Sequence, residues 1–333
     1  MDSEEEGLQF LGFFGIYREA YNIITSRRKI FSQITLAFVL PLSFIYLAQT
    51  KISDLFFPKM MHNQEKELLT FFAYFRLSSE FTAFLIFKVM YLIFLLVLSL
   101  FSTSAIVYTV ACAYTTKEIT FVKVASVVPT VWKRLMITFL WTSIVMFLYN
   151  FFTMIILFFL VVPVSLSHGG RTPAAIDILS NIVVIIWAIG FVYVSVIWHL
   201  ASVVSVLEES YGYKAFLKSK ALIKGKMWIT LVIFIKLEFS FMVALYAFHN
   251  LVDNGRTGLM GKVILGLFCF SLLSILISFA LVIQTVVYFV CKSYHHENID
   301  KSCLDEHLDA YNLGDYVPLI KDKDIQLEQS SEV

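Results

Sequence analysis

Six long apolar runs constrain this sequence more than any of its other features. A bilayer core of about 30 Å needs roughly 20 apolar residues at 1.5 Å of helical rise each, and every run reaches that length. Membrane-spanning β-strands would be about 10 residues long with alternating character, so helices are predicted instead. The predicted spans are 30–49, 81–114, 135–164, 176–207, 229–251 and 263–291.

Composition supports a membrane protein and excludes some partners. Apolar residues make up 59% of the 333-residue chain and charged residues 15%, well below the roughly one-quarter that is typical of soluble domains. The 26 Lys and Arg nearly balance the 25 Asp and Glu, so no basic excess indicates nucleic acid. The fold class expected is an all-α integral membrane protein with about six transmembrane helices and additional interfacial amphipathic helices.

Basic residues beside the spans predict the orientation, because Lys and Arg are retained on the cytosolic side. They gather before the first span, between spans two and three, and between spans four and five. Both termini are therefore expected in the cytosol, and membrane lipids are the expected partners. The sequence leaves open whether the membrane is the plasma membrane or an endomembrane (ER, post-Golgi or vacuolar).

Three regions follow from this topology. Residues 1–29 form a cytosolic segment with an aromatic, basic amphipathic helix over 10–28, and residues 30–291 form the membrane domain. Residues 292–333 form a polar cytosolic tail that is predicted to be disordered. Within the domain, 111–141 and 204–234 share one plan at an offset of about 93 residues, which fits a parallel two-span repeat. Two loops that obey the same topological rule explain the likeness equally well.

The loop between spans four and five predicts a helix in the headgroup plane, because lysines interleave there with apolar residues. Its basic side would face anionic lipid, with each lysine contributing on the order of 1 kcal/mol. The alternative is that these lysines only set topology. They are Lys214, Lys218, Lys220, Lys224 and Lys226.

Charges within spans are costly and therefore mark candidate sites. Lys236 and Glu238 lie in the fifth span and Lys88 in the second. Positions 236 and 238 are about 200° apart on a helix and must meet different neighbours. Glu238 is expected to contact Lys88 or an amide side chain, and the candidate amides are Asn150, Asn181 and Gln284. A relay or transport role competes with purely structural contacts between helices.

Motifs for common enzyme chemistry do not occur in the sequence. It contains no HExxH, no GxSxG, no Gly-rich phosphate loop and no cysteine pair with zinc spacing. We therefore expect no catalytic residues, no cofactor, no metal and no enzymatic activity. Pro41 is expected to interrupt the first helix.

The tail carries two overlapping short patterns of the kind that clathrin adaptors bind. Tyr316 and Leu319 fit a tyrosine-based sorting motif, and Asp315 with Leu319 and Ile320 fits an acidic dileucine motif. Cys291, at the predicted cytosolic edge, is a candidate for palmitoylation, with an unmodified thiol as the alternative.

The stretch VLEESYGYKAFLKSKALIKGKMW resembles the signature of a multi-pass family that includes the membrane domain of some bacterial glycerophosphodiester phosphodiesterases. The matching positions are Glu208, Gly212, Lys218 with Ser219, and Lys224 to Lys226. With VYTVACAYTTKEITF and VWKRLMITFLW, the chain is similar to a plant-specific group of uncharacterised six-span proteins. The resemblance implies a membrane fold and no catalytic domain.

The sequence thus favours a non-enzymatic endomembrane scaffold that organises partners or lipid. The alternative is a transporter or lipid-handling protein that uses the intramembrane charges. Oligomeric state does not follow from the sequence.

Overall fold

Helices are the only regular secondary structure in the described part of the protein. The computed structural model describes residues 10–62, 79–115, 119–167, 174–253 and 258–295, and no strand occurs among them. Its elements are α2 (Phe13–Ser26), α3 (Arg28–Ile34), η1 (Thr35–Val39), α4 (Leu40–His62), α6 (Ser79–Tyr114), α7 (Phe121–Ser167), α8 (Ala174–Leu207), α9 (Tyr213–Leu222), α10 (Met227–Phe248), η2 (His249–Asp253) and α11 (Leu259–Tyr294).

Among the described residues, six helical stretches are long and apolar enough to cross a membrane, which confirms the predicted fold class. They are Arg28–Lys51, Leu85–Tyr114, Phe121–Leu160, Ile178–Leu207, Met227–Val252 and Met260–Tyr294. Each contains most of one span predicted from the sequence. The protein is therefore a multi-pass helical membrane protein.

The first span is irregular close to Pro41, as expected. A π-turn, η1, occupies Thr35–Val39 immediately before α4. Proline lacks an N–H, and its ring crowds the carbonyl four residues earlier, so the regular hydrogen-bond pattern fails there. At the start of this turn the Thr35 hydroxyl lies 3.1 Å from that of Ser278 on α11. The irregular turn therefore lies against a neighbouring helix.

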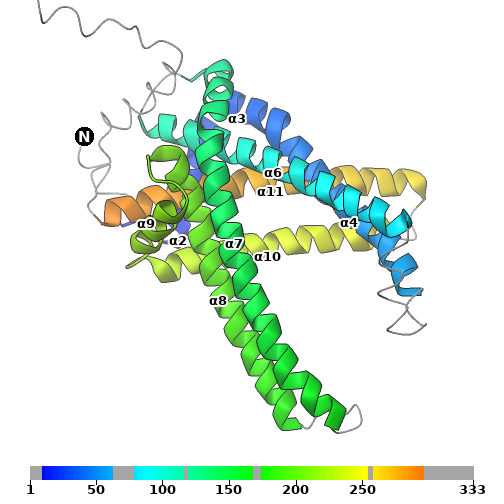
Figure 1. Ribbon diagram of the computed structural model, residues 1–333. Helices are drawn as coiled ribbons and strands as arrows, with labels where there is room; N and C mark the ends of the chain where they lie inside the picture. The colour runs from blue at the N-terminus through cyan, green and yellow to red at the C-terminus, as the bar shows by residue number, and fades with distance from the viewer. Residues whose placement is uncertain (1–9, 63–78, 116–118, 168–173, 254–257, 296–333) are drawn as a thin grey trace, which may run out of the picture.

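One end of each span contributes to a large buried cluster, which we call the core cluster. It gathers the last turns of α6, α8 and α11, the first turns of α7 and α10, and parts of α2, α3 and α9 (Figure 1). Among its fully buried members are Ile106, Leu135, Leu200, Ile233 and Ile283. The span ends that the basic residues assign to the cytosol are the ends that pack together here.

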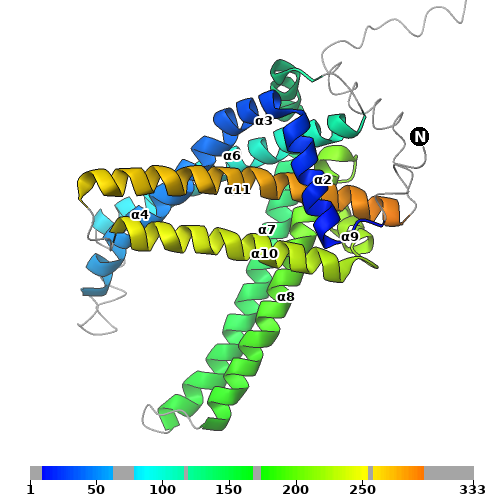
Figure 2. The same ribbon diagram turned by 180° about the vertical axis from the view of Figure 1, so that it is seen from behind.

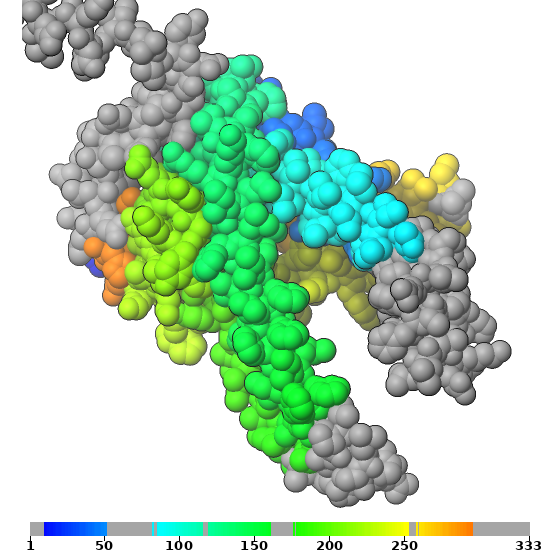
Figure 3. All heavy atoms as spheres, in the orientation of Figure 1, coloured from blue at the N-terminus to red at the C-terminus, as the bar shows by residue number. Residues whose placement is uncertain are grey.

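Beyond the core cluster the helices separate into two arms. The α7–α8 pair extends away from the other spans, as Figures 1 and 2 both show. In the second arm a smaller cluster joins α4, α10 and α11 through Leu47, Phe248 and Leu273. Figure 3 shows open space between the arms on the face it presents. The arms carry large exposed apolar side chains such as Phe159 and Ile186, as surfaces in contact with lipid do.

Helix α2 crosses α11 beside the core cluster (Figure 2). Its buried side consists of Ile16, Ala20 and Ile23, and the Tyr17 ring lies 5.9 Å from that of Phe279 on α11. Large aromatic side chains remain exposed on its other side, among them Phe14. A helix therefore occupies most of 10–28, and its buried apolar side packs on protein.

The two halves of the suggested repeat differ in structure. In the first, the basic amphipathic stretch and the following span form one continuous helix, α7. In the second, α9 and α10 are separate helices. Ser126 is exposed whereas its counterpart Ser219 is buried. The shared plan thus leads to different packing.

Candidate functional site

Two glycines with left-handed backbone geometry bracket α9. Gly212 has φ +62° and Gly225 has φ +94°, a region that residues with a Cβ rarely adopt. A Cβ at Gly225 would also overlap the ring of Tyr294 on α11. At the end of α9, the His295 ring lies 3.1 Å from the carbonyl oxygen of Leu222. The chain therefore turns sharply before and after α9 and is held against α11.

A buried hydroxyl pair fixes the first of these turns. The Thr138 hydroxyl of α7 lies 2.7 Å from the Ser205 hydroxyl of α8. It also accepts a 2.7 Å hydrogen bond from the backbone N–H of Gly212. Thr138 and Ser205 are fully buried, so this contact joins α7, α8 and the α9 loop inside the core cluster.

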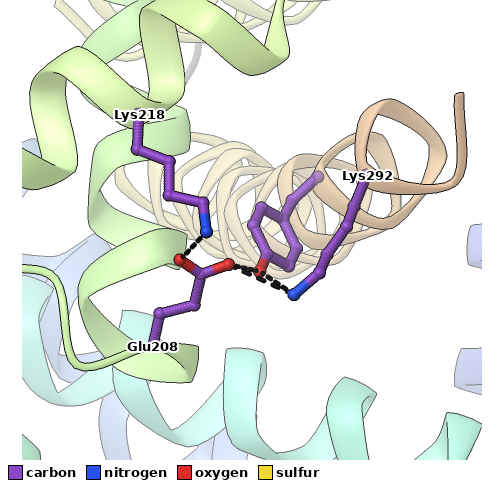
Figure 4. A network of polar contacts seen from close by, with 4 residues as sticks. Glu208, Lys218 and Lys292 are labelled. Atoms are coloured by element: carbon purple, nitrogen blue, oxygen red, sulfur yellow. Dashed lines mark hydrogen bonds and ion pairs between the residues drawn. The ribbon is translucent and has the colours of Figure 1, made fainter. Parts of the chain in front are cut away.

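Glu208, the first residue after α8, forms the main charged contact of this region (Figure 4). Its carboxylate lies 2.7 Å from Lys218 Nζ of α9 and 3.2 Å from Lys292 Nζ of α11. The Tyr288 hydroxyl donates a 2.6 Å hydrogen bond to the same carboxylate. Only 13% of the Glu208 side chain is exposed. One carboxylate thus links the end of α8 to the neighbouring α9 and to α11, which is distant in sequence.

The surroundings of Glu208 favour its charged form. Burial by itself would raise the pKa of this carboxyl, but hydrogen bonds from Lys218 and Tyr288 and the charges of Lys292 and Lys218 outweigh it. The pKa of Glu208 is therefore held below its usual value. The contact is a persistent ion pair at neutral pH.

Helix α9 has one buried side and one exposed side. We call the exposed side the outer face. Ala215, Ser219 and Leu222 form that buried side. This buried side of α9 packs into the core cluster, through Ala215 and Leu222. We define the outer face as Tyr213, Lys214, Leu217 and Lys220 of α9 together with Lys224 in the turn that follows it, all of them exposed.

The five lysines predicted to face lipid divide into two groups. Lys214, Lys220 and Lys224 are exposed. Lys218 binds Glu208, and Lys226 lies 5.4 Å from the centre of the Tyr294 ring. Only the first three are free of these contacts within the protein. Sequence spacing could not distinguish the groups, because the distinction depends on how α9 and the turn after it pack against the end of α8 and against α11.

A second polar group lies within the spans, where α8, α10 and α11 meet. His199 Nε2 of α8 is 3.5 Å from the Glu238 carboxylate of α10. On the other side of the ring, His199 Nδ1 is 3.2 Å from Gln284 Oε1 of α11. The Gln284 amide nitrogen donates a 2.7 Å hydrogen bond to the backbone carbonyl of His199. Phe234 stacks on the imidazole at 5.0 Å.

The structure shows which groups lie next to the charged residues that were predicted within spans, Glu238 and Lys236. Glu238 pairs with His199, a partner that sequence reasoning missed, while the proposed partner Gln284 belongs to the same group through the imidazole. Lys236 lies 4.9 Å from the Phe13 ring of α2. The expectation that positions 236 and 238 meet different neighbours is thus met. Lys88 lies partly buried on α6.

Comparison with known proteins identifies a family. A family model described as "Domain of unknown function (DUF8558)" matches residues 1–330. The chain belongs to the DUF8558 family. Searches of curated proteins and of solved structures gave no match.

The DUF8558 match carries no information about plants or about phosphodiesterase-linked membrane domains. The residues behind that resemblance nevertheless have structural roles here. Glu208 and Lys218 form the ion pair, and Gly212 and Gly225 provide the two turns. In this DUF8558 protein the motif positions α9 on the core cluster.

Three further predictions for this DUF8558 protein concern palmitoylation of Cys291, metal binding and the sorting patterns in the tail. Cys291 is fully buried in the core cluster, so this conformation does not expose it for palmitoylation. Among the described residues no group of three or more His, Cys, Asp or Glu is arranged to hold a metal. The sorting patterns lie outside the described residues and stay a prediction; they comprise Asp315, Tyr316, Leu319 and Ile320.

Proposed function

We propose that this protein is a non-enzymatic membrane organiser that gathers anionic lipid head groups around the outer face of α9. The observation that carries the proposal is the division of the lysines. Three stay exposed beside Tyr213 and Leu217, while the opposite side of α9 is buried in the core cluster. Tyrosine, leucine and lysine together are typical of helices at a membrane interface.

A fixed helix binds head groups better than a free one, because its ordering cost is met during folding. Gly212, Gly225 and the Glu208 ion pair supply that order here. Each exposed lysine near an anionic surface contributes on the order of 1 kcal/mol. Three lysines therefore give about 3 kcal/mol, or roughly a 100-fold preference for anionic over zwitterionic lipid.

Trp228 offers a direct test, since its side chain is 77% exposed at the start of α10. The full-length protein, with its four other tryptophans replaced by Phe, is placed in vesicles that contain brominated phosphatidylglycerol or brominated phosphatidylcholine. The ratio of Trp228 quenching by the two lipids gives their relative affinity. Replacing Lys214, Lys220 and Lys224 with Gln should lower that ratio by up to about 100-fold.

A matched variant removes three lysines near the opposite span ends, Lys51, Lys59 and Lys262. It changes net charge equally and should leave the ratio unaltered. An unchanged ratio in the α9 variant, or an equal fall in the matched variant, would refute the proposal.

A second candidate function is lipid transport, which the half-exposed Glu238 within its span favours. Its test is transbilayer movement of a fluorescent phospholipid in proteoliposomes. A folded Glu238→Gln variant that loses the movement supports transport, and one that retains wild-type rates removes Glu238 from this role.

A further inference from the structure

Gln284 determines where the hydrogen sits on the His199 ring. The backbone carbonyl of His199 can only accept a hydrogen bond, so the Gln284 group 2.7 Å from it must be the NH₂. The other end of the amide, Oε1, then faces His199 Nδ1 at 3.2 Å. Because Oε1 can only accept, Nδ1 must carry a hydrogen.

The hydrogen on Nδ1 constrains the other side of the ring. His199 Nε2 faces Glu238 Oε1 at 3.5 Å. If Nε2 and the carboxylate were both without a proton, lone pairs would face a negative charge. A single proton between them removes the conflict, either as imidazolium beside carboxylate or as neutral imidazole beside carboxylic acid.

The location makes a missing proton costly. His199 lies eight residues before the end of α8 and Glu238 eleven residues after the start of α10. At 1.5 Å per residue these positions are about 12 Å and 17 Å from the ends of their helices. The side chains are 36% and 54% exposed, toward a region where lipid replaces water. Without its proton the pair would carry a net negative charge there, which hydrocarbon disfavours.

The ionisable groups on the neighbouring helices allow His199 and Glu238 to be treated as one titrating pair. Tyr46 of α4 lies within electrostatic range of Glu238, and Tyr91 of α6 within range of Tyr46. Most of the remaining ionisable groups on the packed helices contact other partners. Tyr149 binds the Trp187 carbonyl, Lys218, Tyr288 and Lys292 bind Glu208, and Lys236 lies over Phe13.

We propose that His199 and Glu238 form an intramembrane site that binds one proton between Nε2 and the carboxylate, with Gln284 as the positioning residue. On release, the shared proton leaves to water, Nε2 keeps its lone pair and the carboxylate keeps its charge. On uptake, the proton returns to the same place and the pair becomes neutral. The site is independent of the outer face of α9, since different residues form it.

Infrared difference spectroscopy tests the shared proton on full-length protein in lipid nanodiscs. Acid-minus-base spectra should contain a carboxyl signal that disappears in Glu238→Gln and changes in His199→Gln. Glu209→Gln, which removes an exposed carboxylate in the loop between α8 and α9, should leave that signal intact. A signal that survives Glu238→Gln, or is identical in His199→Gln, would overturn the proposal.

A second measurement needs no variant and so does not depend on variant folding. Trp198–His199 is the single Trp–His pair in the chain, so ¹³C-carbonyl tryptophan with uniformly ¹³C,¹⁵N-labelled histidine selects the His199 backbone nitrogen, and transfer through the side-chain carbons then assigns its ring nitrogens. Nitrogen NMR should find a hydrogen on Nδ1. A ring with hydrogen on Nε2 and a bare Nδ1 would contradict the assignment from Gln284.

Discussion

Replacing Glu208 with Gln should destabilise the protein by about 2–3 kcal/mol. Removing one partner of a buried ion pair costs about 3–5 kcal/mol, because the remaining charge is left unpaired. Here the side chains of Lys218 and Lys292 are 34% and 19% exposed, so water compensates part of the loss. The amide can still accept the hydrogen bond from Tyr288, which keeps the estimate below the upper figure.

Acid should reduce the difference between wild type and Glu208→Gln. The pKa of Glu208 is lower in the folded state, so its stabilisation is complete above the ordinary carboxyl pKa of 4.5. It is lost as the pH falls through the folded-state pKa. The two proteins should therefore differ most near neutral pH and converge under strongly acidic conditions.

Unfolding in mixed detergent and SDS, followed by tryptophan fluorescence, measures this difference. Glu209→Gln is the matched control, since Glu209 is the exposed neighbour of Glu208. In a double-mutant cycle, Lys218→Met should cost less in the Glu208→Gln background than alone, by about 1 kcal/mol or more. Equal stability of Glu208→Gln and Glu209→Gln would refute the role given to this ion pair.

Two further predictions concern backbone geometry and topology. Gly225→Ala should destabilise the protein by more than about 1 kcal/mol in the same unfolding assay, because position 225 has a positive φ and an added Cβ would overlap the Tyr294 ring. Gly12→Ala, at an exposed position, is the control and should be nearly neutral. Glycosylation tags placed after Arg171 or Asn254 should be modified in microsomes and a tag beside Lys214 should not; the reverse pattern would contradict the predicted orientation.

Hydrophobic length made the fold class predictable. A run such as 176–207 has few alternatives to a spanning helix, and α8 occupies 174–207. The amphipathic character of α9 also followed from its lysine spacing. Its buried side did not, because amphipathicity says that one face is covered without saying by what. The partner is the core cluster, which exists only once several spans have packed.

The polar contacts were harder to predict from the sequence than the fold class. Glu238 was recognised as costly in its span, yet its partner His199 lies 39 positions earlier on a different helix. Glu208 belonged to the quoted motif, but its second partner Lys292 is 84 positions away. Local spacing cannot predict such pairs, since they depend on the relative rotation of neighbouring helices.

Gly212 and Gly225 turn the chain so that one face of α9 packs on the core cluster and the opposite face is exposed. Lys214, Lys220 and Lys224 are exposed, so substitutions at these positions should leave folding intact. Members of the family could therefore acquire different surface chemistries on one unchanged framework. Exchanging this exposed face between relatives should change the lipid preference that we propose for it, while the rest of the chain stays the same.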